Sequence, residues 1–251
     1  MEGSSTENGR QKAQVGGQDA SYVREAFSKI ADRYVVTNHV LSAGVDILWR
    51  RKVARMVREW KPLSILDVAS GTGDLALEMQ KICLGAEVMA TDFCADMLSH
   101  ASRRGVNQTQ VADALDMPFE DGAFDVVTVA FGLRNMADWE GGLREMARLC
   151  QGGRLLVLDF SLPKGLLRRP YSFYLDRVLP KVAGGLTGQR EAFEYLAGTI
   201  GKFPSGTEMC ELFEKAGLRE PQAIPLSGGI ASIYTGYSPE VKANSKDESS
   251  V

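Results

Sequence analysis

The sequence has few of the residues that build metal centres and disulfide frameworks. It contains four cysteines and two histidines among 251 residues, and the cysteines are scattered without a C-x-x-C pair. Neither a zinc site nor a disulfide framework is indicated by this spacing, and the pattern fits a reducing compartment. We therefore expect no metal site.

Long hydrophobic runs and an excess of positive charge are also missing. No apolar stretch has the length of a membrane span, and the first 18 residues do not resemble a secretory signal, so we expect a cytoplasmic protein. The formal net charge of −3 argues against a nucleic-acid partner. One basic run could touch anionic lipid at the inner face of the membrane, although such runs are more often solvated helix faces. Its members are Arg50, Arg51, Lys52, Arg55 and Arg58.

The two ends of the chain differ in composition from its centre. Residues 1–18 are rich in glycine, serine, glutamine and charge, and residues 239–251 are polar with almost no apolar content. We expect both tails to lack fixed structure. Between them, residues 19–238 are long enough to form a single α/β domain, which we expect to begin with a helical cap.

Short apolar runs alternate with segments of helical periodicity through this domain. The alternation predicts a mostly parallel seven-stranded sheet with helices on both faces. We expect strands at 64–68, 87–92, 109–112, 124–130, 154–160, 222–224 and 232–236. Crossover helices are expected at 75–82, 95–103 and 140–149. After the fifth strand, residues 162–204 contain aromatic-rich helical segments, which we interpret as a lid-like helical insertion over the carboxyl edge of the sheet.

A glycine loop follows the first expected strand. Gly71, Thr72 and Gly73 precede a helix, so the backbone can approach a ligand where a side chain would clash. Residues 71–76 also fit the G-x-G-x-x-A pattern of dinucleotide-binding proteins. The loop alone therefore leaves open both a methyltransferase and a nicotinamide-dependent dehydrogenase.

Three acidic residues sharpen this choice. Asp92 closes the second strand, where its carboxylate can accept both ribose hydroxyls of an adenosine ligand. Asp113 follows the third strand, where it or its neighbouring backbone can meet the adenine edge. Asp67 lies inside the first strand, and a buried carboxylate needs a partner. This partner could be the α-amino group of a methionine moiety or the amides of the loop that follows Asp67. A dinucleotide-binding fold usually has an apolar residue at this position.

These motifs resemble those of class I methyltransferases. The pattern comprises D-x-A-x-G-x-G-D at 67–74, Asp92, and A-D-A at 112–114 before M-P-F at 117–119. More specific strings resemble the ubiquinone/menaquinone biosynthesis C-methyltransferases, from about residue 23 to 237. They are F-G-L-R-N at 131–135, G-R-L-L-V-L-D-F-S at 153–161, Y-L-A-x-T-I at 195–200, and an N-terminal pattern from Phe27 to Gly44 followed by Trp49 and Arg50.

The resemblance implies a Rossmann-like class I methyltransferase fold with S-adenosylmethionine as cofactor, contacted by Thr72, Asp92, Asp113 and Ala114. It implies methyl transfer to a ring carbon of a demethylated polyprenyl quinol, either demethylmenaquinol or the ubiquinone precursor. An acceptor with an apolar tail also implies transient contact with a membrane surface. A homo-oligomer or partner proteins from quinone biosynthesis are further expectations. In one departure from the family pattern, Ala130 replaces a serine that some members have, so we leave it out of the site.

Arg134 and Asn135 are the candidate catalytic residues, because they follow the fourth strand, whose carboxyl end borders the cofactor crevice. Arg134 could stabilise developing phenolate charge or orient a water, but it is a poor base because guanidinium stays protonated. In the competing interpretation Arg134 simply pairs with an acid such as Asp138.

Three further residues are weaker candidates. His39 could act as a base near neutral pH, and Tyr34 and Tyr171 could line a pocket for a flat ring. Side chains of these kinds are more often part of the core. Two other functions stay open, namely a nicotinamide-dependent oxidoreductase and a non-catalytic methyltransferase-like scaffold of a quinone-synthesis complex.

Overall fold

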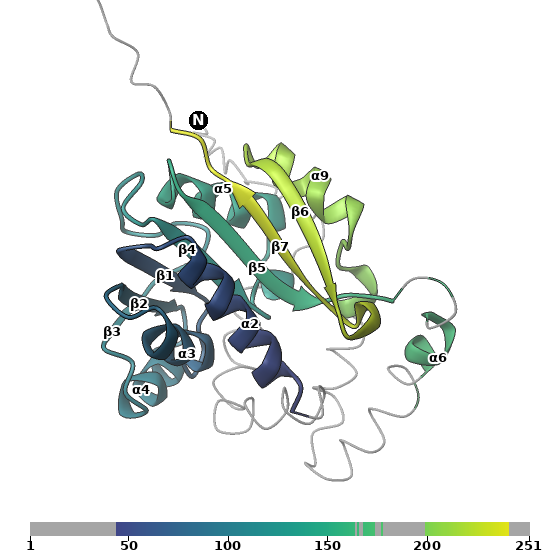
Figure 1. Cartoon of the computed structure of the whole chain (residues 1–251), viewed down its shortest axis with the longest axis horizontal. Helices are drawn as coiled ribbons and strands as arrows, with labels where there is room; N and C mark the ends of the chain where they lie inside the picture. Colours follow the sequence, from purple (N-terminus) through teal and green to yellow (C-terminus); the bar gives the residue numbers. More distant parts are fainter. Residues whose placement is uncertain (1–43, 164, 166–167, 174–176, 178–198, 241–251) are drawn as a thin grey trace, which may run out of the picture.

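The structure is a computed structural model, and it describes residues 44–163, 165, 168–173, 177 and 199–240. Seven strands form one sheet in the order β3-β2-β1-β4-β5-β7-β6 (Figure 1). The strands are β1 (Ser64–Val68), β2 (Glu87–Asp92), β3 (Gln108–Val111), β4 (Val126–Ala130), β5 (Arg154–Phe160), β6 (Arg219–Leu226) and β7 (Ala231–Tyr237). The helices are α2 (Asp46–Glu59), α3 (Asp74–Ile82), α4 (Ala95–Arg103), α5 (Trp139–Leu149), α6 (Arg168–Phe173) and α9 (Thr207–Lys215), with short 3₁₀ turns η1 (Leu133–Asn135) and η4 (Ser227–Gly229).

The strand order reverses next to β1. This strand pairs in parallel with β2 on one side and with β4 on the other, so the chain moves outward through β2 to β3 and then returns past β1 to form β4. Such a switch point opens a crevice at the carboxyl ends of the strands, where open α/β sheets bind their ligands. Only β7 runs against its neighbours, β5 and β6. The mostly parallel seven-stranded sheet expected from the sequence is confirmed.

Helices cover both faces of the sheet, as expected. Buried side chains of α2, α3 and α4 form one core with one face, and those of α5 and α9 form a second core with the other. Figure 1 shows α2 in front of the sheet and α5 behind it. Strand β5 contributes to both cores, because Leu156 and Leu158 face α2 whereas Leu155 and Val157 face α5.

Some strand boundaries differ from the expected ones. Strand β4 begins at Val126 and not at 124, and just before it the Asp125 carboxylate accepts hydrogen bonds from the amides of Leu63 and of Ser64, the first residue of β1. Strand β6 is longer than expected and includes Pro225. Proline has no amide hydrogen to donate, but an edge strand such as β6 tolerates it on its unpaired side.

Much of the expected helical cap and insertion lies outside the described residues. Within the described part, α2 begins at Asp46, α6 lies inside the insertion 162–204, and residues 199–202 are helical. The expected tail 1–18 and residues 241–251 of the other tail are also outside it. No described helix is both long and apolar enough to cross a bilayer.

Candidate functional site

The glycine loop leaves β1 in a left-handed conformation. Ala69, Gly71 and Gly73 have φ values of 50°, 58° and 80°, a region that glycine enters without steric cost. A Cβ atom on Gly73 would also lie 2.6 Å from Cγ2 of Val106 and 3.0 Å from Cβ of Ala101. Position 73 therefore requires glycine both for its backbone angle and for the close packing of the start of α3 against α4 and the segment that follows α4.

Asp67 is buried directly beneath this loop. Its Oδ2 accepts a hydrogen bond from Oγ of Ser70 at 2.5 Å, and its Oδ1 accepts one from Oγ1 of Thr128 at 2.8 Å. Burial raises the pKa of Asp67 to about 6, although the two hydroxyls and the charge of Arg50 act in the opposite direction. The carboxylate thus anchors its own loop, chiefly through side-chain hydroxyls and not through the loop amides that the alternative interpretation proposed.

Asp92 connects the glycine loop to the next helix. Its Oδ2 accepts from the amide of Gly71 and its Oδ1 from the amide of Cys94, both at 2.9 Å. Burial raises the pKa of this carboxyl group against the effect of these amides. Because each carboxylate oxygen has a second lone pair, Asp92 keeps the capacity to accept two ribose hydroxyls.

Thr72 is held from outside the loop by a residue that the sequence did not reveal. The Thr72 carbonyl accepts a hydrogen bond from Nη1 of Arg104 at 2.8 Å, and Nη2 of the same arginine lies 2.7 Å from Oδ1 of Asp74. Arg104 follows α4 and comes 32 residues after Thr72. No motif spacing could have indicated this contact.

The turn at Asp113 and Ala114 lies beside Asp92. The amide of Ala112 donates to the Asp92 carbonyl at 3.1 Å, so the chain leaves β3 next to Asp92. Oδ1 of Asp113 accepts from the amide of Leu115 at 3.0 Å, which closes a tight turn with an exposed carboxylate. The structure therefore brings all seven predicted cofactor residues to one edge of the sheet.

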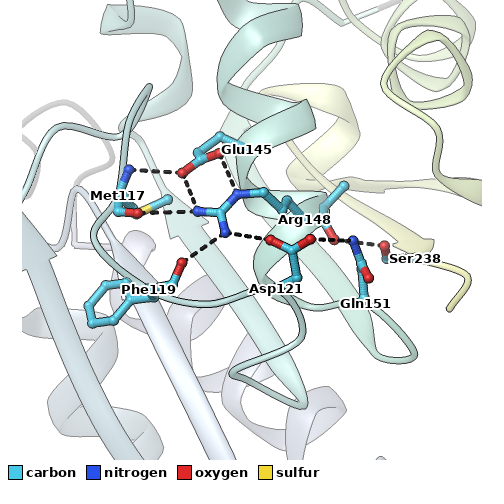
Figure 2. A network of polar contacts seen from close by, with 8 residues as sticks. Met117, Phe119, Asp121, Glu145, Arg148, Gln151 and Ser238 are labelled. Atoms are coloured by element: carbon cyan, nitrogen blue, oxygen red, sulfur yellow. Dashed lines mark hydrogen bonds and ion pairs between the residues drawn. The ribbon is translucent and has the colours of Figure 1, made fainter. Parts of the chain in front are cut away.

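An arginine network fixes the segment that follows this turn (Figure 2). Arg148 on α5 donates to the carbonyls of Phe119 and Met117, at 2.8 and 3.1 Å, and forms ion pairs with Asp121 and Glu145. Glu145 in turn accepts from the Met117 amide at 2.8 Å. The hydrogen bond from Arg148 lowers the pKa of Glu145. The sequence analysis missed Arg148, because helix spacing does not show which loop a side chain will meet.

Arg134 is a buried residue with a buried partner. Its Nη1 lies 2.6 Å from Oδ1 of Asp159 and 2.7 Å from the carbonyl oxygen of Phe131. The expected alternative partner is wrong, because Asp138 instead accepts from the amide of Gly141 and caps α5. Burial raises the pKa of Asp159, and the adjacent guanidinium counteracts this shift.

Asn135 presents a polar atom without a protein partner. Its Nδ2 donates to the Phe131 carbonyl at 3.3 Å, whereas its Oδ1 is buried and meets no hydrogen-bond donor in the structure as described. Leaving a buried acceptor unsatisfied costs about 1–3 kcal/mol. Such an atom is a natural place for a hydroxyl group of a ligand.

Three buried aromatic rings pack together beside Arg134, at the carboxyl ends of β4 and β5. The ring centroids of Phe131 and Phe160 are 4.7 Å apart, and the ring of Trp49 lies within 6.3 Å of both. Arg50 is buried, with its Cζ 5.1 Å from the Phe131 centroid, and pairs with Asp46. Arg50 is therefore wrongly grouped with the solvated basic run.

The structure gives little support to the weaker candidate site residues. Tyr171 is half-buried and packs against the core on the α2 side of the sheet, whereas His39 and Tyr34 lie outside the described residues. Within the described part of the chain, no cluster of histidine, cysteine or acidic side chains could hold a metal ion.

Comparison with known proteins supports a methyltransferase. The profile of the ubiE/COQ5 methyltransferase family matches residues 14–238. A demethylmenaquinone methyltransferase of Thermus thermophilus is 43% identical over 220 residues, which cover 85% of this chain and all of that protein. A ubiquinone/menaquinone biosynthesis C-methyltransferase UbiE of Bdellovibrio bacteriovorus is 39% identical over 85% of this chain and 94% of its own length.

Solved structures confirm the fold. A S-adenosylmethionine-dependent methyltransferase of Thermotoga maritima, described as a possible histamine N-methyltransferase, superposes with a TM-score of 0.62. The alignment covers 86% of this chain and 99% of that one at 18% sequence identity, so it bears on the fold alone. The family match decides between the two interpretations of the glycine loop in favour of a methyltransferase. This chain belongs to the ubiE/COQ5 methyltransferase family and is a S-adenosylmethionine-dependent methyltransferase.

Proposed function

We propose that this protein transfers a methyl group from S-adenosylmethionine to a ring carbon of a demethylated polyprenyl quinol. The supporting observation is the direct contact between the cofactor loop and the family-specific segment 131–135. A Cβ atom on Gly132 would lie 2.6 Å from Cβ of Ala69 and 3.0 Å from Cγ2 of Val129. This segment therefore borders the cofactor crevice, where an acceptor ring must lie to receive the methyl group.

The residues of the crevice fit S-adenosylmethionine. Asp92 has free acceptor capacity for ribose, the turn at Asp113 and Ala114 stands beside it for adenine, and the loop at Gly71 offers an approach without side chains. The cofactor would supply an already electrophilic methyl group. The task of the protein is then to align the acceptor carbon with that group and to exclude water.

Arg134 and Asn135 divide the work at the acceptor side. Arg134 is occupied by Asp159 and by the Phe131 carbonyl, so it fixes the position of the segment that carries Asn135. Asn135 is the direct contact, because its unsatisfied Oδ1 can accept a hydrogen bond from a quinol hydroxyl. The buried rings of Trp49, Phe131 and Phe160 pack beside Arg134 and support the segment that would border the acceptor ring.

The acceptor is demethylmenaquinol in the first instance, because proteins named demethylmenaquinone methyltransferase are 40–43% identical to this chain. The ubiquinone precursor is the second acceptor to test, because other relatives are named for both quinones. Since such acceptors have apolar tails, we place the protein in the cytoplasm, attached peripherally to the inner face of the membrane during turnover.

A reconstituted methylation assay tests this function. The purified full chain is incubated with S-adenosylmethionine and a reduced short-tailed demethylmenaquinol, and the product is quantified by mass spectrometry. We expect a gain of one methyl group on the ring, and no product from an acceptor whose ring position is already methylated. Binding of S-adenosylmethionine without any methylated product from either quinol class would instead support a scaffold.

A further inference from the structure

The solvent-facing side of α2 combines basic and apolar side chains. Its exposed residues recur at intervals of three and four positions, so they share one face of the helix. We call this face the α2 strip, and it consists of Ile47, Leu48, Arg51, Lys52, Arg55, Arg58 and Glu59. The opposite side of the same helix, which includes Trp49 and Val53, is buried against the sheet.

The charge of the α2 strip contrasts with that of the whole protein. Four cations face solvent here with one neighbouring exposed acid, Glu59, whereas the chain has a formal net charge of −3. Arg51 forms an ion pair with Glu78 at 2.9 Å. A protein of negative net charge is repelled by an anionic surface unless it offers a local cluster of cations.

Exposed aliphatic side chains lie at both ends of the α2 strip. Ile47 is 48% exposed and Leu48 60% exposed at the start of the helix. Beyond its end, Leu63 and Leu84 are 74% and 87% exposed and line one hollow with Arg58. Of the six exposed large hydrophobic side chains among the described residues, these are four, so the apolar surface is concentrated beside the basic residues.

The orientation of α2 relates the α2 strip to the methyl-transfer site. Trp49, in the first turn, contacts Phe131 and Phe160 at the carboxyl edge of the sheet. Trp60, just beyond the last turn, stacks with Arg154 at the start of β5. Ile47 and Leu48 are therefore at the end of α2 that is nearest the carboxyl edge of the sheet.

We propose that the α2 strip is the surface with which this protein docks on an anionic phospholipid bilayer. The cations would lie at the headgroups while Ile47 and Leu48 enter the boundary of the acyl chains, as in other interfacial helices. This orientation brings the crevice edge to the bilayer, where a polyprenyl tail resides. The proposal rests on the proposed function, because a lipid-soluble acceptor gives the protein a reason to bind there.

Vesicle co-sedimentation with the full chain tests the proposal. We expect stronger binding to vesicles of phosphatidylglycerol and phosphatidylcholine than to phosphatidylcholine alone, and loss of binding as salt rises. Each cation near such a surface strengthens binding about fivefold, so the double variant Lys52→Gln/Arg55→Gln should bind about 25-fold more weakly. Ile47→Ser/Leu48→Ser should also weaken binding, but it should leave the salt dependence unchanged.

A matched control removes the same charge from the other face of the sheet. Arg144 on α5 and Lys215 on α9 are exposed, and the variant Arg144→Gln/Lys215→Gln should bind vesicles like the wild type. Equal binding to neutral and anionic vesicles, or an equal loss in the control variant, would overturn the proposal.

A turnover assay separates this proposal from the proposed function. Lys52→Gln/Arg55→Gln should methylate a short-tailed, water-soluble acceptor at the wild-type rate, because neither residue belongs to the crevice. Vesicle binding requires no turnover, and turnover with that acceptor requires no vesicle. Failure of either inference can therefore be recognised while the other stands.

Discussion

Nη1 of Arg134 lies 2.6 Å from Oδ1 of Asp159, and both side chains are buried at the carboxyl ends of neighbouring strands β4 and β5. The pair connects η1, which contains Asn135, to the central sheet. It also fixes the Phe131 carbonyl, because the same Nη1 donates to that oxygen. We therefore propose that the arginine of the family-specific segment acts on the reaction mainly by holding the segment in place.

Breaking this pair should reduce both stability and turnover. Asp159→Asn leaves the buried guanidinium without its countercharge, so we expect the free energy of unfolding to fall by about 3–5 kcal/mol. In Arg134→Ala we expect turnover to fall while S-adenosylmethionine affinity is spared. Urea unfolding measures the stability, the methylation assay measures turnover, and titration calorimetry measures the affinity for S-adenosylmethionine. The double variant Arg134→Met/Asp159→Leu should be less destabilised than Asp159→Asn, and equal destabilisation would contradict a coupled pair.

Asp92 should control cofactor affinity. Asp92→Ala removes the acceptor for the amides of Gly71 and Cys94 and for the proposed ribose hydroxyls, so S-adenosylmethionine should bind at least about 100-fold more weakly, equivalent to about 3 kcal/mol. Glu87→Gln is a control on the same strand, because Glu87 is exposed at its opposite end. Wild-type affinity in Asp92→Ala, measured by calorimetry, would refute the assignment.

Asn135 should affect turnover more than cofactor binding. Asn135→Leu removes the carbonyl oxygen that is proposed to accept a quinol hydroxyl, and we expect kcat to fall by about 10- to 100-fold, as for the loss of one polar contact in a site. The Kd of S-adenosylmethionine should change by less than about twofold by the same reasoning. A wild-type kcat with the short-tailed acceptor would remove Asn135 from the site.

Arg148 should influence the cofactor through the segment that it holds. Arg148→Ala deprives the carbonyls of Met117 and Phe119 of their donor, so the nearby turn at Asp113 should lose its fixed position (Figure 2). We expect KM for S-adenosylmethionine to rise by about tenfold, which is the effect of losing one hydrogen-bonded contact, while kcat at saturation stays unchanged. Arg144→Ala removes an exposed ion pair with Glu140 on the same helix and serves as the control. A fall in melting temperature without a change in KM would limit Arg148 to a stabilising role.

Asp67 should make stability depend on pH. Its pKa is raised to about 6 in the folded protein from an ordinary value of 3.8, so the folded state binds the proton more tightly than the unfolded state. Stability from this group is then present at low pH and is lost as pH rises from about 4 through 6. Between pH 4.5 and 7 the loss should be on the order of 2 kcal/mol.

The variant Asp67→Asn isolates that contribution. Urea unfolding of the wild type and the variant across this pH range should show their stability difference shifting in favour of Asp67→Asn as pH rises. Asp92 and Asp159 have pKa shifts of the same direction and are present in both proteins, so they cancel in the comparison. A stability difference that does not change with pH would contradict the raised pKa.

The sequence by itself determined the sheet and the position of the glycine loop at the end of its first strand. Apolar runs gave β1, β2 and β5 their observed bounds, because strands buried on both faces are continuous in hydrophobicity. The glycine loop and its acids were also legible, because close backbone approach leaves few residue choices. These features depend on neighbours in the chain.

Only the tertiary structure decided how the side chains are paired. Arg134 meets Asp159, 25 residues away, and not the nearby Asp138, because strand β5 lies beside β4 in the sheet. Arg148 holds a loop about 30 residues distant, and Arg50 turns inward while the rest of its basic run faces solvent. Such contacts depend on sheet order and helix rotation, which local periodicity does not specify, so the sequence could place Arg134 after the fourth strand but could not identify its partner.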